Sequence, residues 1–319
     1  MQEIEFTHIE GLKVGHAQDL EAATGCTVII SEEGAVAGVD VRGGAPGTRE
    51  TDLLNPVNMV QKIHAVVLAG GSAFGLDAAC GVMQFLEERN IGFDVKVTKV
   101  PLVSGAVLFD LEIGDCRVRP DRAMGYQACL AAGRGSLAQG NIGAGTGASV
   151  GKIFGMGRAM KSGLGSFAVQ AGNLKIGAVV AVNALGDVID PATGKRIAGL
   201  LNEELKDLAD TEECLIRSCS EKKDFFNRNT TIGIVATNAA LTKTGAAKVA
   251  SMAQNGYART IRPAHTMFDG DTIFTMATGR VEADLTVVGL LAARVIERSV
   301  VAAVLNAGPL CGLKCHADL

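Results

Sequence analysis

The amino-acid sequence predicts an α/β fold in which helices and strands form a sandwich rather than a doubly wound parallel sheet. Segments with strand-like and helix-like spacing of apolar residues are interleaved along the chain, but they do not follow a strict βαβα order. Hydrophobic residues make up 48% of the 319 residues, and 40 residues are glycine against only seven prolines. We therefore expect a core of small aliphatic residues at close backbone approach. The length suits one large domain or two small ones, of which we expect a single domain over residues 1–319.

The expected elements follow from apolar spacing and from the turn-forming residues between them. The first part should form a hairpin (25–40) around a turn at 32–34, a long polar loop (42–56), a buried strand (64–71), a helix with apolar residues at helical spacing (74–89), and short strands (95–100 and 106–109). The middle should form a helix (122–132), a glycine-rich loop (140–151), a buried strand (174–183) and a helix with acidic first turns (202–217). After a polar stretch (218–229), the pattern predicts a β-branched strand (230–237), a helix (244–255), two strands flanking a turn at 268–271, and a closing helix (287–306).

Composition excludes several classes of protein. The net charge of −4 comes without a basic cluster, which argues against a nucleic-acid partner. The most apolar late stretch, residues 285–296, contains Arg294 and is shorter than the ~20 residues that a membrane span needs. The first residues show no basic region followed by an apolar run, and the eight cysteines are scattered, so we expect a cytoplasmic protein with reduced thiols.

Cysteine and glycine motifs were tested as metal and nucleotide sites. Cys311, Cys315 and His316 could form half of a metal site, but no second cluster with zinc spacing accompanies them, so we expect no metal and no cofactor. The loops at 68–75 and 143–152 follow neither the dinucleotide nor the phosphate-loop spacing. Turns and close packing are the favoured interpretation of these glycines, and a non-catalytic nucleotide-binding module stays as an alternative.

The junction between Asn229 and Thr230 has a chemical interpretation beside the structural one of a strand edge. A threonine hydroxyl can attack the preceding carbonyl by an N→O acyl shift, and hydrolysis of the ester then cuts the chain. The freed α-amine, with an ordinary pKa of ~7.7–8.0, can act as the base for its own hydroxyl. Asn183, at the end of a predicted strand, could donate to the oxyanion, and Asp269 and Asp271 could bind the amine or a hydroxyl.

The segment around this junction resembles the autocleavage segment of the self-processing P1-type aminopeptidases. That family includes L-aminopeptidase/D-amidase/esterases, β-peptidyl aminopeptidases and the 6-aminohexanoate (nylon) oligomer hydrolases. The similarity extends over nearly the whole chain. The motifs that carry it are NTTI (229–232), VATNA (235–239), RGGAPGTRETD (42–52), LAGGSAFGLDAA (68–79), GAGTGASVGK (143–152) and HTMFDGDTIF (265–274).

The resemblance implies a role for each matching site residue. Thr230 would be the nucleophile, and Lys152 resembles the lysine that tunes its protonation. Asn183 resembles the oxyanion-hole asparagine. Asp269 and Asp271 resemble the acidic pair of the nylon-oligomer hydrolases, which orients the nucleophile; some aminopeptidase members have serine and glutamate there. These matches place the sequence nearer the threonine branch.

One position departs from this pattern. Phe109 stands where the nylon-oligomer hydrolases have a tyrosine, so any hydrogen bond made by that hydroxyl is missing, which puts nylon-oligomer activity in doubt. We expect Phe109, Gly70 and Gly71 to line the substrate site.

The resemblance also implies a four-layer α/β/β/α sandwich, similar in layering to N-terminal nucleophile hydrolases but with different connectivity. Cleavage between Asn229 and Thr230 would leave an α chain (1–229) and a β chain (230–319). The β segment has eight basic and six acidic residues, which gives +2 and leaves −6 for the α segment, so the two should stay together. Relatives assemble as tetramers or larger rings, which implies a homo-oligomer of αβ units.

The expected function is hydrolysis of small peptides or amides through an acyl-enzyme at Thr230. The alternative within enzymes is an acyltransferase of the ornithine-acetyltransferase type, which would pass the acyl group to an amine instead of water. The sequence leaves open which L-, D-, β- or ω-amino acid amides, or esters, are substrates.

Overall fold

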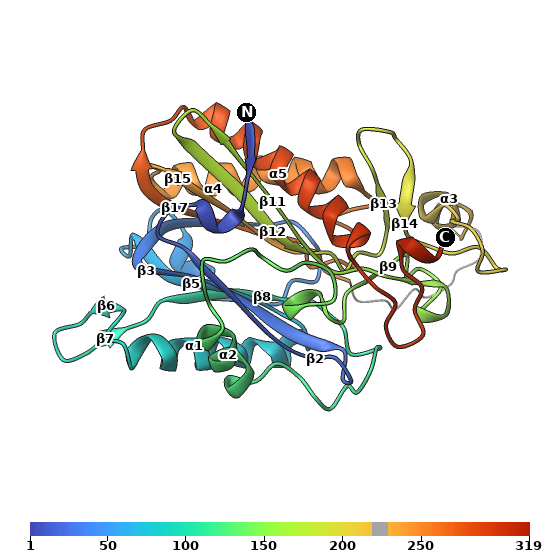
Figure 1. Cartoon of the computed structure of the whole chain (residues 1–319), viewed down its shortest axis with the longest axis horizontal. Coiled ribbons are helices and arrows are strands. Elements are labelled where there is room, and N and C mark those ends of the chain that lie inside the picture. The colour runs from blue at the N-terminus through green and yellow to red at the C-terminus, as the bar shows by residue number, and fades with distance from the viewer. Residues whose placement is uncertain (219–228) are drawn as a thin grey trace.

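The computed structural model describes residues 1–218 and 229–319, and its elements are stacked in four layers (Figure 1). Helices α4 (Lys243–Thr260) and α5 (Leu285–Leu305) cover one side, and α1 (Ala78–Glu87) and α2 (Arg122–Leu130) cover the other. The strands lie between them in two layers. This arrangement confirms the α/β/β/α sandwich.

One hydrogen-bonded network connects both strand layers. The neighbouring pairs β15–β17 and β5–β8 are parallel and the other pairs are antiparallel. The order is β1 (Gln2–Ile4), β11 (Leu164–Ala171), β12 (Leu174–Ala181), β15 (Ile232–Ala239), β17 (Thr272–Val281), β3 (Thr24–Val41), β5 (Lys62–Ala69), β8 (Val103–Val107) and β4 (Thr48–Arg49), with β2 (Lys13–Asp19) on β3. Shorter pairings involve β6 (Phe93–Asp94), β7 (Lys99–Val100), β9 (Ser149–Val150), β10 (Met160–Lys161), β13 (Asp187–Ile189), β14 (Arg196–Ala198) and β16 (Ile261–Arg262).

Strand β3 joins the two layers, and it corrects the predicted hairpin. Residues 36–41 pair with β17, whereas residues 26–30 pair with β5. The register to β5 shifts between Ile30 and Ala35, and Gly34 within this irregularity has a φ of +74°. The turn-like residues 32–34 therefore bend one long strand instead of reversing it, because each half finds its partners on other strands.

Three apolar layers fill the spaces between the four structural layers. Along β12, Ile176, Ala178 and Val180 face α4 and α5, whereas Val179 and Ala181 face the second strand layer. This alternation is the period of two that a strand imposes on its side chains. The third layer packs β3, β5 and β8 against α1 and α2. Apolar side chains thus cover both faces of each strand layer.

Phe274 offers a direct test of the layer between the sheets, where its side chain is fully buried. We expect Phe274→Ala to lower the free energy of unfolding by about 3–5 kcal/mol, because it removes apolar contacts and leaves a cavity. Thermal and denaturant unfolding of the variant measure this change. The substitution Met267→Ala is a suitable control because that side chain is exposed.

Other predicted elements were confirmed or shortened. The strand at 64–71 is β5, the strand at 174–183 is β12, and the closing helix is α5. The helix predicted at 202–217 is wrong for its first half, since α3 spans only Thr211–Ser218 and turns precede it. Most of the polar stretch 218–229 lies outside the described residues. Strands β1, β2 and β11 were not predicted.

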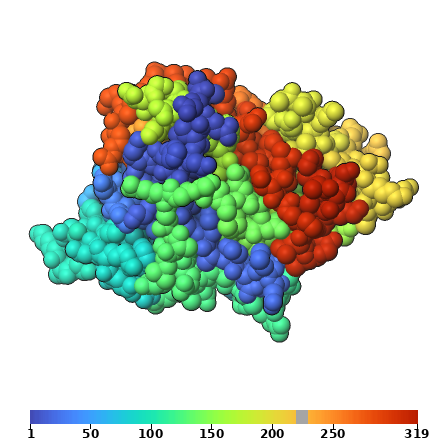
Figure 2. All heavy atoms as spheres, viewed as in Figure 1, coloured from blue at the N-terminus to red at the C-terminus, as the bar shows by residue number. Residues whose placement is uncertain are grey.

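The C-terminal residues pack on the body of the molecule. Figure 2 shows them in red beside the yellow segment near residue 200. Lys314 Nζ donates to the Leu205 carbonyl at 2.7 Å, and His316 Nδ1 lies 2.7 Å from the Ile197 carbonyl oxygen.

Within the described part of the chain, no helix combines the length and apolar character that crossing a membrane requires.

Candidate active site

The topology brings Thr230 and the 269–271 turn together. Strands β15 and β17 are parallel neighbours with Ile232 opposite Thr272, so the residues before each strand begin at the same sheet edge. Asn229 forms a bridge to Asp269, and the Asn229 amide donates to the Phe268 carbonyl at 2.9 Å. Asn229 and Thr230 are buried, with exposed fractions of 1% and 4%.

The peptide bond between Asn229 and Thr230 is held at both ends. The Thr230 amide donates to the Asn183 carbonyl at 2.9 Å, and the Gly270 amide donates to the Asn229 carbonyl at 2.9 Å. The Thr230 hydroxyl also donates to the Asn229 carbonyl oxygen. A Cβ atom on Gly270 would lie 2.7 Å from Thr230 Oγ1, so glycine leaves the space that this hydroxyl occupies.

Asn183 follows β12, whose end meets the beginning of the antiparallel β15. Its Oδ1 accepts from Lys152 Nζ at 2.8 Å and from the Ser149 amide at 3.1 Å. Its Nδ2 donates to the Phe109 carbonyl at 2.9 Å. These contacts fix which end of the amide faces which partner. An amide nitrogen carries two hydrogens, and Phe109 takes one of them.

Lys152 is buried at the end of the glycine-rich loop. Its Nζ also donates to the Asn183 main-chain carbonyl at 3.2 Å, the same oxygen that receives the Thr230 amide. Burial lowers the pKa of Lys152 to about 7, and the charge of Asp269 opposes this shift. A lysine with this pKa changes protonation near neutral pH, as a group that assists proton transfer requires.

The two predicted aspartates bind backbone groups near Thr230. Asp271 accepts from the Thr231 amide at 2.8 Å and from the His265 amide at 2.9 Å. Asp269 accepts from the Thr266 amide at 3.0 Å and weakly from the Leu185 amide at 3.4 Å. Burial, reinforced by the neighbouring Asp271, raises the pKa of Asp269 to about 6.

The contacts of Asp269 and Asp271 refine the expectation that the pair orients the nucleophile. Within the described residues, the hydrogen bonds that the two carboxylates accept involve Thr231, His265, Thr266 and Leu185, and none of these comes from Thr230. The Asp271 carboxylate therefore contacts the backbone one residue after Thr230, whereas the Asp269 carboxylate holds Thr266 and Leu185.

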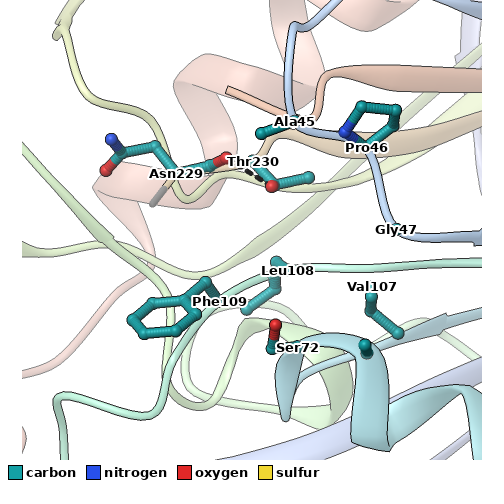
Figure 3. Close-up of a pocket in the computed structure, with 10 residues that line it drawn as sticks. Ala45, Pro46, Gly47, Ser72, Val107, Leu108, Phe109, Asn229 and Thr230 are labelled. Atoms are coloured by element: carbon teal, nitrogen blue, oxygen red, sulfur yellow. Dashed lines mark hydrogen bonds between the residues drawn. The ribbon is translucent and has the colours of Figure 1, made fainter. Parts of the chain in front are cut away.

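A cavity of about 300 Å³ opens beside Thr230 (Figure 3). Phe109 lines it, as expected, together with Leu108 and Val107 on the side opposite Thr230. The complete lining is Ala45, Pro46, Gly47, Ser72, Ala73, Val107, Leu108, Phe109, Asn229 and Thr230.

Gly70 and Gly71 lie behind this lining instead of in it. The Gly71 amide donates to Asp110 Oδ1 at 2.6 Å, and a Cβ on Gly70 would overlap the same carboxylate. In the second glycine loop, a Cβ on Gly145 would overlap the Leu164 backbone, and one on Gly147 would overlap the Ala23 carbonyl. These glycines serve close packing, which is the use that the sequence favoured.

Sequence reasoning missed several residues of the site. Ser149 and Gly270 act through backbone amides, which leave no signal in residue type. Ser72 lines the cavity with a left-handed backbone, φ +55°. Asp110 follows Phe109 directly, and its buried carboxylate also accepts from Thr24 Oγ1 at 2.8 Å. In the described ranges, no group of three metal-ligating side chains comes together.

The family model and the curated relatives place this fold and site in a class of hydrolases. The chain belongs to Peptidase family S58, whose family model matches residues 5–317. An uncharacterised aminopeptidase of Mycobacterium tuberculosis is 42% identical, with 98% of this chain and 97% of that protein covered. A 6-aminohexanoate-oligomer endohydrolase of Paenarthrobacter ureafaciens is 32% identical, with 92% and 84% covered.

Two solved structures share the fold. The L-aminopeptidase D-Ala-esterase/amidase from Ochrobactrum anthropi superposes with a TM-score of 0.71 at 19% identity, covering 95% of this chain and 86% of that one. A β-aminopeptidase from Burkholderia gives a TM-score of 0.70 at 19% identity, covering 98% and 91%. The chain is therefore an aminopeptidase or amidohydrolase by family, with the layered fold of N-terminal nucleophile hydrolases.

Proposed function

We propose that the protein is a self-processing amidohydrolase that uses Thr230 as an N-terminal nucleophile and hydrolyses small peptides or amides through an acyl-enzyme. The observation that carries the proposal is the contact between the Thr230 hydroxyl and the Asn229 carbonyl, within a peptide bond held at both ends. The attacking oxygen, the scissile carbonyl and the leaving nitrogen are each held by a hydrogen bond before any reaction begins.

Self-cleavage follows from these contacts. Thr230 Oγ1 attacks the Asn229 carbonyl carbon, and the negative charge that develops on the carbonyl oxygen is met by the Gly270 amide. The C–N bond breaks, the proton lost by the hydroxyl ends on the Thr230 nitrogen, and an ester joins the two residues. Water then hydrolyses the ester and leaves a carboxylate on Asn229 and a free amine on Thr230.

Turnover reuses the same groups. The Thr230 amine takes the proton of its own hydroxyl, which attacks the carbonyl of a bound amide. The second Nδ2 hydrogen of Asn183 stabilises the oxyanion, while Lys152 and Ser149 hold the amide in orientation. The amine product leaves, and water releases the acyl group from Thr230. The substrate binds in the cavity that Phe109 lines.

Intact mass measurement of the purified protein tests the proposal. We expect two polypeptides, of 229 and 90 residues, and an N-terminal sequence of the smaller that begins at Thr230. Hydrolysis of short amides should accompany the cleaved form. A full-length chain that persists on long incubation and still hydrolyses amides would contradict the proposal.

Gly270→Ala should block self-cleavage while the protein still folds. The added Cβ would lie 2.7 Å from both Thr230 Oγ1 and the Ala45 carbonyl oxygen, so the hydroxyl loses its place beside the carbonyl. We expect at least a tenfold slower appearance of the two fragments, followed by denaturing electrophoresis over time. Gly157→Ala is a matched control, because nothing lies within 4 Å of that position and its backbone is not left-handed. Normal cleavage in Gly270→Ala would contradict the proposed geometry.

A further inference from the structure

His265 lies three residues after β16, and both its amide and its ring contact the Asp271 carboxylate. The His265 amide donates to Asp271 Oδ2 at 2.9 Å, and His265 Nδ1 lies 3.0 Å from the same oxygen. We propose that His265 is a positioning residue for the Thr230 reaction, and that it acts through Asp271 on the Thr231 amide. This inference rests on the proposed function, since it concerns how Thr230 is held once the chain has been cut.

The Asp271 carboxylate divides its two oxygens between two neighbours. Oδ2 receives both His265 donors, and Oδ1 accepts from the Thr231 amide at 2.8 Å. An ionised carboxylate only accepts hydrogen bonds, so the contact places the ring hydrogen on Nδ1. Asp271 is buried, so water does not easily replace a donor that is lost. Without the ring donor, the carboxylate could turn about its Cβ–Cγ bond, away from Thr231.

The backbone of His265 accompanies this arrangement. Its φ of +58° lies in the left-handed region, which is uncommon for residues other than glycine. Local strain of this kind persists where surrounding contacts hold it, and it is concentrated at functional sites. Here the left-handed backbone occurs where the amide and the ring nitrogen of one residue reach the same carboxylate oxygen.

In the intact chain, Thr230 is fixed from its N-terminal side. It is joined to Asn229, whose amide donates to the Phe268 carbonyl and whose carbonyl accepts from the Gly270 amide, both at 2.9 Å. Hydrolysis of the bond before Thr230 removes this tether and leaves the Thr230 nitrogen beside the Asn183 carbonyl. Self-cleavage therefore uses a nucleophile that the chain itself holds in place.

After the cut, the Thr231 peptide connects Thr230 to the sheet. The Thr231 amide is bound by Asp271, and the Thr231 carbonyl accepts from the Thr272 amide at 3.1 Å. Because His265 fixes the orientation of the Asp271 carboxylate, it should matter more for turnover than for self-cleavage. A reacting group displaced by about 1 Å can cost roughly 10²-fold in rate.

Two variants at His265 test the proposal on the full chain. His265→Gly removes the ring and tolerates the left-handed backbone, whereas His265→Asn also tolerates it and returns an N–H donor near the position of Nδ1. The substrate is the compound that the wild type hydrolyses fastest in a panel of aminoacyl p-nitroanilides. In His265→Gly we expect kcat to fall about 100-fold, while KM and the rate of self-cleavage change less than about threefold. His265→Asn should bring kcat back to within about tenfold of the wild type.

Added imidazole provides a second measurement. His265 also lines a separate cavity of about 380 Å³, through which imidazole can reach the space that His265→Gly leaves. Imidazole should raise kcat of His265→Gly and leave kcat of the wild type unchanged.

Three results would overturn the inference. These are an unchanged kcat in His265→Gly, a parallel loss of self-cleavage and kcat in that variant, and a kcat that neither His265→Asn nor imidazole restores. The second and third would show that His265 serves the fold in general. A wild-type protein that does not cut itself, or that cuts itself and hydrolyses no compound of the panel, would instead count against the proposed function.

Discussion

Replacing Thr230 by alanine should leave one intact chain and abolish amide hydrolysis. The substitution removes the oxygen that lies against the Asn229 carbonyl, and with it both the self-cleaving and the hydrolytic nucleophile. Denaturing electrophoresis should show a single species of 32.9 kDa, which stays uncut on incubation. Loss of the nucleophile should lower kcat at least 10⁴-fold, to the background of the assay.

Thr230→Ser is the matched control, because it keeps the hydroxyl and removes one methyl group. We expect it to cut itself and to hydrolyse amides, although more slowly. Cleavage of Thr230→Ala at the same bond, or hydrolysis by that variant above background, would show that another group is the nucleophile.

Replacing Lys152 by methionine should lower kcat/KM by about 10²–10³-fold at pH 7, the size expected when an oxyanion donor loses its support. Methionine keeps much of the buried volume but cannot donate to the Asn183 carbonyl and side-chain oxygens. The Asn183 amide would then lose a partner that fixes its orientation, and the Thr230 amine would lose a neighbouring positive charge.

The pH dependence separates a catalytic from a structural role of Lys152. Burial lowers the pKa of this lysine to about 7, so the wild-type activity should fall as the pH drops through about 7 and the lysine and Thr230 amine together take up protons. Without the lysine charge, the Thr230 amine gains protons more readily. The acid limb should therefore move upward, toward the ordinary α-amine pKa of ~8. Profiles of kcat/KM between pH 5.5 and 9 measure this shift.

Lys161→Met is the control for that experiment. Burial also lowers the pKa of Lys161 to about 7, but its Nζ donates to the carbonyls of Gly145, Ala148 and Ser162. Its loss should weaken folding and leave the acid limb where it is. An unshifted limb in Lys152→Met, or the same shift in both variants, would contradict the role assigned to Lys152.

Residue patterns predicted the elements whose signal is local. The buried strand β12 and the long helix α5 are both indicated by runs of neighbouring apolar residues, and both predictions were confirmed. The hairpin at 25–40 failed because Glu32, Glu33 and Gly34 have the composition of a turn, whereas pairing with β5 and β17 decides the path of the chain. Such pairings join residues far apart in sequence, and no local spacing reports them.

The structure brings together several of the residues that the sequence singled out, but their contacts could not be predicted. Similar motifs pointed to Thr230, Lys152 and Asn183, and the structure places all three within one hydrogen-bonded group. That Asp271 binds the Thr231 amide, one residue beyond Thr230, depends on how the ends of β15 and β17 are staggered. Apart from Phe109 and Thr230, the lining of the cavity escaped prediction, because it comes from four separate segments of the chain.

The central place of β15, between β12 and β17, has a consequence for how the protein could be refolded. As one chain, the protein folds with β15 tethered to the strands it must pair with. A cut before Thr230 turns the same assembly into an encounter between two molecules, whose rate depends on their concentration. The 90-residue piece carries β15, β17, α4 and α5, and alone it would expose the apolar faces that these elements bury. After self-cleavage, folding would therefore no longer be readily reversible. The cut protein would persist because it unfolds slowly.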